Sequence, residues 1–203
     1  YVGAVGGAIA LDVVACLGAG KLSSRRFVDI GDNFSEVAEG EWWAYEGHGA
    51  IRASMPLQVT NWLVFTPRAA LTYVALQEEG YTEENGGVTN FDVSEAFSQR
   101  LWGDVGFELS SSFRTRGRGV VAPRLYVGYR ANLIDEVAER DFTPVAGGAK
   151  VTLVDEDYGD GAPIIGIGLD ATNGYSTLSI GYEGEFGDQV ERHSLNAAVR
   201  FRF

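Results

Sequence analysis

The feature that most constrains this chain is a two-residue alternation of apolar and polar side chains. It is clearest near the C-terminus, where Leu195, Ala197, Val199, Phe201 and Phe203 share one face of an extended segment. Successive side chains of a β-strand point to opposite faces, so residues two apart share a face. The alternation therefore predicts β-strands with one apolar and one polar face.

The same alternation occurs in segments spread over the whole chain, and it is least regular between residues 43 and 57. The apolar members are Leu11, Val13, Ala15 and Leu17; Ile51, Ala53 and Met55; Phe65, Ala69, Leu71 and Tyr73; Phe97, Leu101, Val105, Phe107 and Leu109; Leu125, Val127, Tyr129, Ala131 and Leu133; Ile165, Ile167, Leu169 and Ala171; and Leu178, Ile180 and Tyr182. The 27 glycines and 12% aromatic residues also favour an all-β fold.

The second face of these strands collects charged side chains of both signs. The candidates for this polar face are Glu46, Arg52, Arg68, Arg100, Asp104, Glu108, Arg124, Arg130, Glu183 and Arg200. On a soluble β-sandwich they would face solvent, and the apolar residues would form the core. In a transmembrane barrel they would line a wet lumen, and the apolar face would contact lipid.

The connecting segments favour the barrel, because short and long connectors alternate, as periplasmic turns and extracellular loops do. Short ones lie near Gly6-Gly7, 58–61, 114–119 and 172–174, and long ones at 31–41, 78–90, 134–162 and 187–192. We predict an antiparallel transmembrane β-barrel in one domain, residues 1–203, with about nine strands. Single-chain bacterial barrels have even strand numbers, so we expect opening strands to be missing upstream.

Composition excludes several other classes of protein. With 28 acidic and 16 basic residues the net charge is −12, which does not suit nucleic-acid binding. Cys16 is the only cysteine, so neither an internal disulfide nor a cysteine-based zinc site is expected. No apolar run reaches about 18 residues, so no transmembrane helix is predicted. The mean hydropathy of −0.04 suits both a soluble protein and a barrel.

Few residues suggest catalysis or metal binding. His48 and His193 are the only histidines, and we interpret both as structural because no Gly-x-Ser-x-Gly turn accompanies them. The acidic segment 155–161 offers oxygen ligands suited to Ca²⁺, although a solvated loop is the preferred interpretation. The basic cluster at 114–118 is interpreted as a solvated turn. We expect no catalytic, cofactor-binding or metal-binding residues, and no cofactor.

Aromatic residues gather near the ends of the predicted strands. They are Tyr1, Trp42, Trp43, Tyr45, Trp62, Tyr73, Tyr129, Tyr182, Phe201 and Phe203. Such residues are typical of the interfacial belts of membrane proteins, so we expect them to mark the two edges of a membrane-spanning band.

Six pieces of the sequence, in this order, resemble the autotransporter β-domain family. They are 63–73, with Pro67 after an apolar run; 80–83; 91–113; 123–129; 178–186; and 193–203, which ends on Phe203. The resemblance implies an outer-membrane protein of a Gram-negative cell. It implies a twelve-stranded barrel, an even number as single-chain barrels have, a helical segment in the pore and a passenger domain upstream.

The resemblance also implies function and partners. The barrel would anchor the protein among outer-membrane lipids and serve in type V secretion, the display of the passenger at the cell surface. The last strand, with Val199, Phe201 and Phe203, would be the signal that the outer-membrane barrel assembly machinery reads. An outer-membrane porin or diffusion channel without a passenger is the main alternative. A barrel enzyme and a secreted soluble sandwich are the others.

Overall fold

A computed structural model describes residues 2–6, 9–29, 35–116, 119–156, 158–189 and 191–201. Phe203, one of the residues expected in the assembly signal, lies outside this described part. Two antiparallel sheets contain all fifteen described strands. Among the described residues, no helix has the length and apolarity that crossing a membrane demands.

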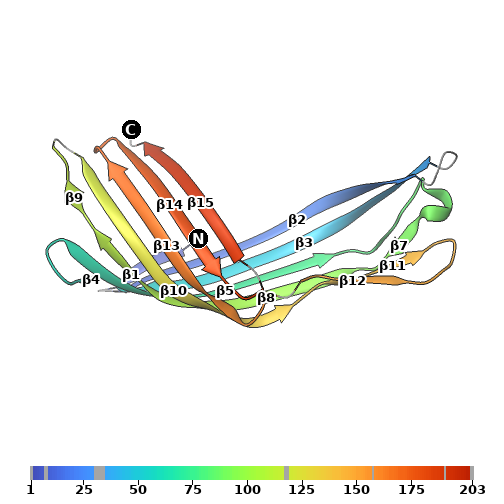
Figure 1. Cartoon of the computed structure of the whole chain (residues 1–203), viewed down its shortest axis with the longest axis horizontal. Coiled ribbons are helices and arrows are strands. Elements are labelled where there is room, and N and C mark those ends of the chain that lie inside the picture. The colour runs from blue at the N-terminus through green and yellow to red at the C-terminus, as the bar shows by residue number, and fades with distance from the viewer. Residues whose placement is uncertain are drawn as a thin grey trace.

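The main sheet follows the order of the chain. Its path is β1 (Val2–Gly6), β2 (Ile9–Asp29), β3 (Ser35–Ser54), β5 (Leu63–Glu78), β8 (Ala96–Ser111), β10 (Val120–Glu136), β13 (Gly161–Thr172), β14 (Ser176–Phe186) and β15 (Glu191–Phe201). Two short strands, β4 (Leu57–Gln58) and β9 (Phe113–Arg114), pair with β5 and β10 at hairpin turns. The sheet curls into an open half-barrel with β1 and β15 at its edges (Figure 1).

The second sheet corrects the expectation that 78–90 and 134–162 are loops. These segments contain β6 (Tyr81–Thr82), β11 (Glu139–Pro144) and β12 (Val151–Val154), with a 3-10 turn at Gly87–Thr89, and β7 (Phe91–Val93) follows directly after the first of them. β3 likewise begins at Ser35, inside the expected loop 31–41. The pairing places Val93, Phe142 and Val151 on one face of this sheet, and that shared apolar face explains why the segments are ordered.

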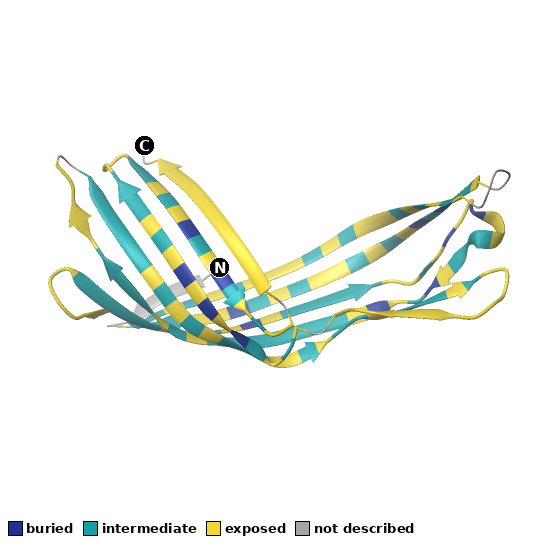
Figure 2. Ribbon diagram, viewed as in Figure 1, coloured by how far each residue is buried: buried dark blue, intermediate teal, exposed yellow. Residues whose placement is uncertain are grey.

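Burial alternates along several strands of the main sheet, as the stripes in Figure 2 show, whereas β15 at the edge is exposed throughout. On β13, Ala162, Ile164 and Gly166 are buried, whereas Pro163, Ile165 and Ile167, which alternate with them, are exposed. The apolar face predicted from the sequence is thus the exposed one, with Val105 61% and Leu195 79% exposed.

Within the described part of the chain, no second layer covers the apolar face of the main sheet. The accessible surface is 13520 Å², whereas a soluble globular monomer of 21.9 kDa would expose about 9,300 Å². Only six apolar side chains of the described residues are buried. An apolar face of this extent needs an apolar environment, such as lipid or another protein surface.

The apolar face has a defined height, which β2 shows most clearly. From Ile9 to Ala19 its exposed odd-numbered residues are apolar, and Lys21 ends the series. On β3 the residues opposite Ala19 and Lys21 are Tyr45 and Trp43. A transmembrane strand needs about 9–11 residues. The apolar stretch of β2 therefore matches a bilayer, and the 21-residue strand continues well beyond it.

Candidate functional site: the concave face

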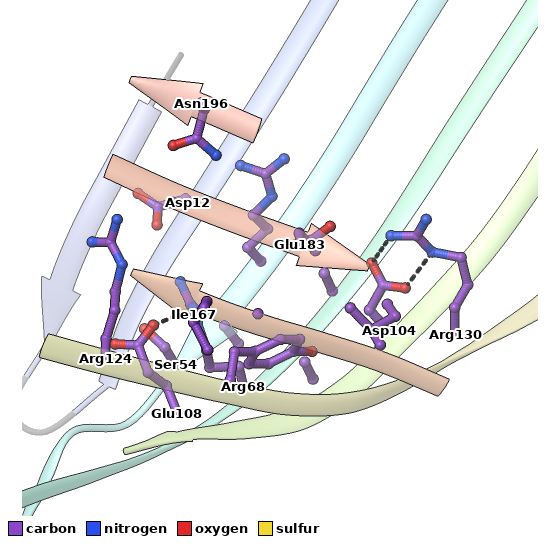
Figure 3. Close-up of a pocket in the computed structure, with 18 of the residues that line it drawn as sticks. Asp12, Ser54, Arg68, Asp104, Glu108, Arg124, Arg130, Ile167, Glu183 and Asn196 are labelled. Atoms are coloured by element: carbon purple, nitrogen blue, oxygen red, sulfur yellow. Dashed lines mark hydrogen bonds and ion pairs between the residues drawn. The ribbon is translucent and has the colours of Figure 1, made fainter. Parts of the chain in front are cut away.

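The concave face of the half-barrel holds a polar hollow of about 540 Å³. Side chains from β2, β3, β5, β8, β10, β13, β14 and β15 line it, and Figure 3 shows them converging from opposite sides of the curl. Asp12 and Asn196 lie near the two edges of the sheet, and Asp104 and Arg130 come from its middle. Curvature thus brings together residues from strands that are not neighbours.

Seven of the ten residues predicted for the polar face line this hollow: Arg52, Arg68, Asp104, Glu108, Arg124, Arg130 and Glu183. Arg100 lines a separate hollow on the same face. The Glu46 side chain lies against Gly18 of the neighbouring strand. Arg200 is exposed on β15 opposite Thr177. That this face lines a water-filled pore in a membrane remains a prediction.

Arg130 forms the centre of the charged network. Its guanidinium donates to both Asp104 carboxylate oxygens, at 2.7 and 3.1 Å, and to Glu185 Oε2 at 2.6 Å. The three side chains are only 12–18% exposed. They join β10 to β8 and, across β13, to β14. Bidentate arginine–carboxylate contacts are geometrically specific, so this network fixes how these strands curl.

Two further ion pairs join neighbouring strands across the same face. Arg68 Nη1 lies 2.8 Å from Glu108 Oε2, and Arg124 Nη1 lies 2.8 Å from Asp170 Oδ2. The Arg68 guanidinium also lies over the Tyr126 ring, 5.7 Å from its centroid. These contacts match positive with negative charge along the wall. Such a surface can solvate a polar or charged polypeptide.

The histidines and the cysteine lie apart from this network. His48 and Cys16 face each other across β3 and β2, and both are exposed. His193 Nδ1 lies 2.8 Å from the Tyr182 hydroxyl, and Phe186 contacts the ring edge. Among the described residues, no group of three or more histidine, cysteine or acidic side chains is arranged to hold a metal ion.

The sequence did not predict that Tyr158 and Arg192 would line a hollow on the concave face. Both line the hollow of about 730 Å³ that also contains Arg100 and Trp102. Tyr158 lies between β12 and β13, and Arg192 lies at the start of β15. The sequence predicts connectors at both places. Neither belongs to an alternating series, so the sequence contains no periodic signal for them.

Several aromatic residues lie at the edge of the apolar face, as expected. Trp43 and Tyr45 are both 44% exposed, and Tyr73 donates to Gln99 Oε1 at 2.8 Å. Trp42, however, was wrongly expected in the belt. Its ring stacks on Tyr81 at 4.4 Å, because its even position on β3 turns it to the concave side.

Beyond the apolar band, β2 and β3 continue into an extension that also comprises β6, β7, β11 and β12. Arg26 on β2 donates to both oxygens of Glu83, at 3.1 and 2.5 Å. Glu83 is only 5% exposed and also accepts from the Phe91 backbone N–H at 2.8 Å. Hydrogen bonding to Glu83 raises the pKa of Arg26. This partly buried pair fixes the second sheet against the strands of the wall.

The outward side of the extension carries paired polar and charged residues, together with the exposed Phe27. Arg25 and Asn85 donate to the Glu39 carboxylate, at 2.8 and 2.9 Å, and these hydrogen bonds hold the pKa of Glu39 below its ordinary value. Lys21 pairs with Glu41 directly above the apolar band. The outward face of β2 thus changes at Lys21 from a purely apolar series to one that contains paired charged residues.

A curled antiparallel sheet with an apolar convex face and a charged concave face defines the wall of a β-barrel of the outer-membrane type. The family model of the autotransporter beta-domain matches residues 1–185, and the chain belongs to that family. Members of this family form outer-membrane β-barrels for passenger secretion. No match is found among the curated proteins.

Proposed function

We propose that this chain forms much of a translocator barrel that anchors its protein in the outer membrane and delivers an upstream passenger to the cell surface. The observation that supports this most is the division of one sheet into an exposed apolar face, eleven residues high on β2, and a charged concave face. A lipid bilayer would cover the apolar face, and a water-filled lumen would solvate the charged face.

The free edges of β1 and β15 support closure into a larger barrel. No pairing between these two strands occurs among the described residues, and an unpaired edge inside a bilayer is strongly unfavourable. We propose that further strands of the same precursor complete a twelve-stranded barrel, an even number as in other single-chain barrels. The extension, with its polar outward side, would then stand on the extracellular side.

The proposed partners follow from the surfaces. Outer-membrane lipids would cover the convex face, and a helical linker to the passenger would occupy the charged lumen. The barrel assembly machinery would recognise the last strand, where Val199 and Phe201 are 59% and 62% exposed. Phe203 belongs to the same proposed signal. A strand with an unpaired edge can add to the edge of another sheet, which makes this recognition physically reasonable.

The proposal can be tested in Gram-negative cells with a precursor that has a reporter domain upstream of this chain. We expect a membrane fraction that only detergent extracts, a heat-modifiable band, and a reporter that added protease removes from intact cells. Deletion of Phe203 should reduce surface reporter while refolding in detergent stays near normal.

Two results would contradict the proposal. A folded chain that stays in solution without detergent would exclude the membrane barrel. An inserted barrel whose reporter stays inside the cell would favour the diffusion channel instead. For the last strand, normal insertion of the Phe203 deletion with only a lower melting temperature would show that Phe203 stabilises the barrel and is no assembly signal.

A further inference from the structure

The extension continues the wall of the main sheet in the same strand order. β5, β8, β10 and β13 are successive neighbours in the main sheet, and β6, β7, β11 and β12 are successive neighbours in the extension. The chain connects β5 to β6, β7 to β8, β10 to β11 and β12 to β13 directly. Two backbone hydrogen bonds between Glu39 and Glu84, of 2.9 and 2.8 Å, join β3 to the segment that follows β6. The concave side of the extension is therefore the continuation of the concave side of the barrel wall.

The concave side of the extension is apolar, whereas that of the main sheet is charged. Residues directly opposite each other in an antiparallel pair share a face, so Tyr81, Val93 and Phe142 lie on one face of the second sheet. The Tyr81 ring stacks on Trp42, which lies on the concave side of β3, so this face is the inward one. Val93 is only 1% exposed. The extension thus has an apolar core on the side where the barrel has its lumen.

Side chains from opposite sides of the curl meet in this core. Trp42 Nε1 donates to Glu78 Oε1 at 2.9 Å, and Arg140 Nη2 lies 2.9 Å from Glu78 Oε2. The Arg140 guanidinium lies 5.8 Å from the Trp42 ring centroid, although β6 and β7 separate β11 from β3 and three strand spacings correspond to about 14 Å. Arg26 of β2 likewise lies over the Phe91 ring, 4.8 Å from its centroid. In the part of the chain that the structure describes, the concave side of the extension is therefore packed with side chains.

The hollow of about 730 Å³, here called the upper hollow, borders this core. Its lining includes Val74, Leu76, Arg100, Trp102 and Arg192. Leu76 lies two residues before Glu78 on the same face of β5, which places the hollow next to the core. The Trp102 ring lies 5.2 Å from the Arg100 guanidinium and 5.4 Å from that of Arg130, which lines the charged hollow of about 540 Å³. The two hollows therefore adjoin along the concave face. The Arg192 side chain is 47% exposed, so the upper hollow reaches the surface at the start of β15.

We infer that a polypeptide leaving the lumen passes through the upper hollow and not along β2 and β3, because the core of the extension closes that side. This inference rests on the proposed function, in which an upstream segment occupies the lumen. The lining suits an unfolded chain, since Val74, Leu76 and Trp102 can contact its apolar side chains. The two arginines of the hollow can contact its acidic side chains. The extension is then a closed side wall of the exit.

The route can be tested by photo-cross-linking in outer membranes from cells that express the full-length precursor, with Cys16→Ser as the background. A benzophenone maleimide is attached to one introduced cysteine, and mass spectrometry identifies the cross-linked peptides. Ser98→Cys places the probe in the upper hollow. Ala44→Cys is the matched position on the concave side of β3, two residues from Trp42 and beside the core. Ala70→Cys, in the charged hollow, reports whether the upstream segment occupies the lumen. A heat-modifiable band confirms that each variant is folded.

We expect cross-links to the upstream segment from Ala70→Cys and Ser98→Cys, and several-fold fewer from Ala44→Cys. The inference would be overturned by cross-links from Ala44→Cys as frequent as those from Ser98→Cys. It would also be overturned if Ser98→Cys gave none while Ala70→Cys gave them. A folded Ala70→Cys protein without cross-links to the upstream segment would instead contradict the proposed occupation of the lumen, and the exit route with it.

Discussion

An arginine at Val105 should reduce the free energy of unfolding in lipid vesicles by about 2–4 kcal/mol. Val105 is 61% exposed on β8, near the middle of the apolar face, where a guanidinium would have to enter hydrocarbon. No carboxylate is expected there to compensate the charge. The loss can be measured by reversible denaturant unfolding of the reconstituted protein, followed by tryptophan fluorescence.

Ala70→Arg is the matched control for Val105→Arg. Ala70 lies on the next strand, on the concave face, and pairs directly with Asp104. The new guanidinium would contact water and a carboxylate, so the free energy of unfolding should change by less than about 1 kcal/mol. Equal losses for the two variants would show that the two faces of the sheet are in the same environment.

The second large effect should come from Arg130→Met. This change leaves Asp104 and Glu185, 18% and 13% exposed, without the cation that both contact. Removing one partner of a mostly buried ion pair costs about 3 kcal/mol or more, chiefly because the remaining charges stay desolvated. The same unfolding measurement would detect the loss.

A compensated variant tests that explanation. Arg130→Met combined with Asp104→Asn and Glu185→Gln also removes the two unpaired carboxylate charges, so it should recover most of the lost stability. Arg200→Met provides the surface control. Because Arg200 is exposed, this substitution should change the free energy of unfolding by no more than about 0.5 kcal/mol. If the triple variant were no more stable than Arg130→Met, the loss would come from packing and not from charge.

The main sheet was predictable because its determinants are local. Alternation fixes which face each residue occupies, and register then follows from short hairpins, as at Thr172–Ser176. The segments around Val105, Tyr129 and Ile167 accordingly show their predicted apolar face exposed.

The extension and the contacts of Tyr158 were not predictable, because they depend on contacts between distant segments. The second sheet joins residues near 91 to residues near 142, and neither strand is long enough to show a clear period. Trp42 was misplaced because strand ends alone do not say which face an aromatic residue occupies. Tyr158 became recognisable only when the curl brought Arg100 and Arg192 to its ring.

The central claim is that one face of this sheet contacts lipid and the other contacts water. Single cysteines in a Cys16→Ser background at 104, 105, 107 and 108 of β8 test it most directly, using a membrane-impermeant maleimide on the precursor in vesicles. We predict rapid labelling at 104 and 108, on the concave face, and protection at 105 and 107 until denaturant unfolds the protein. Equal labelling at all four positions in the folded, membrane-inserted protein would contradict the account.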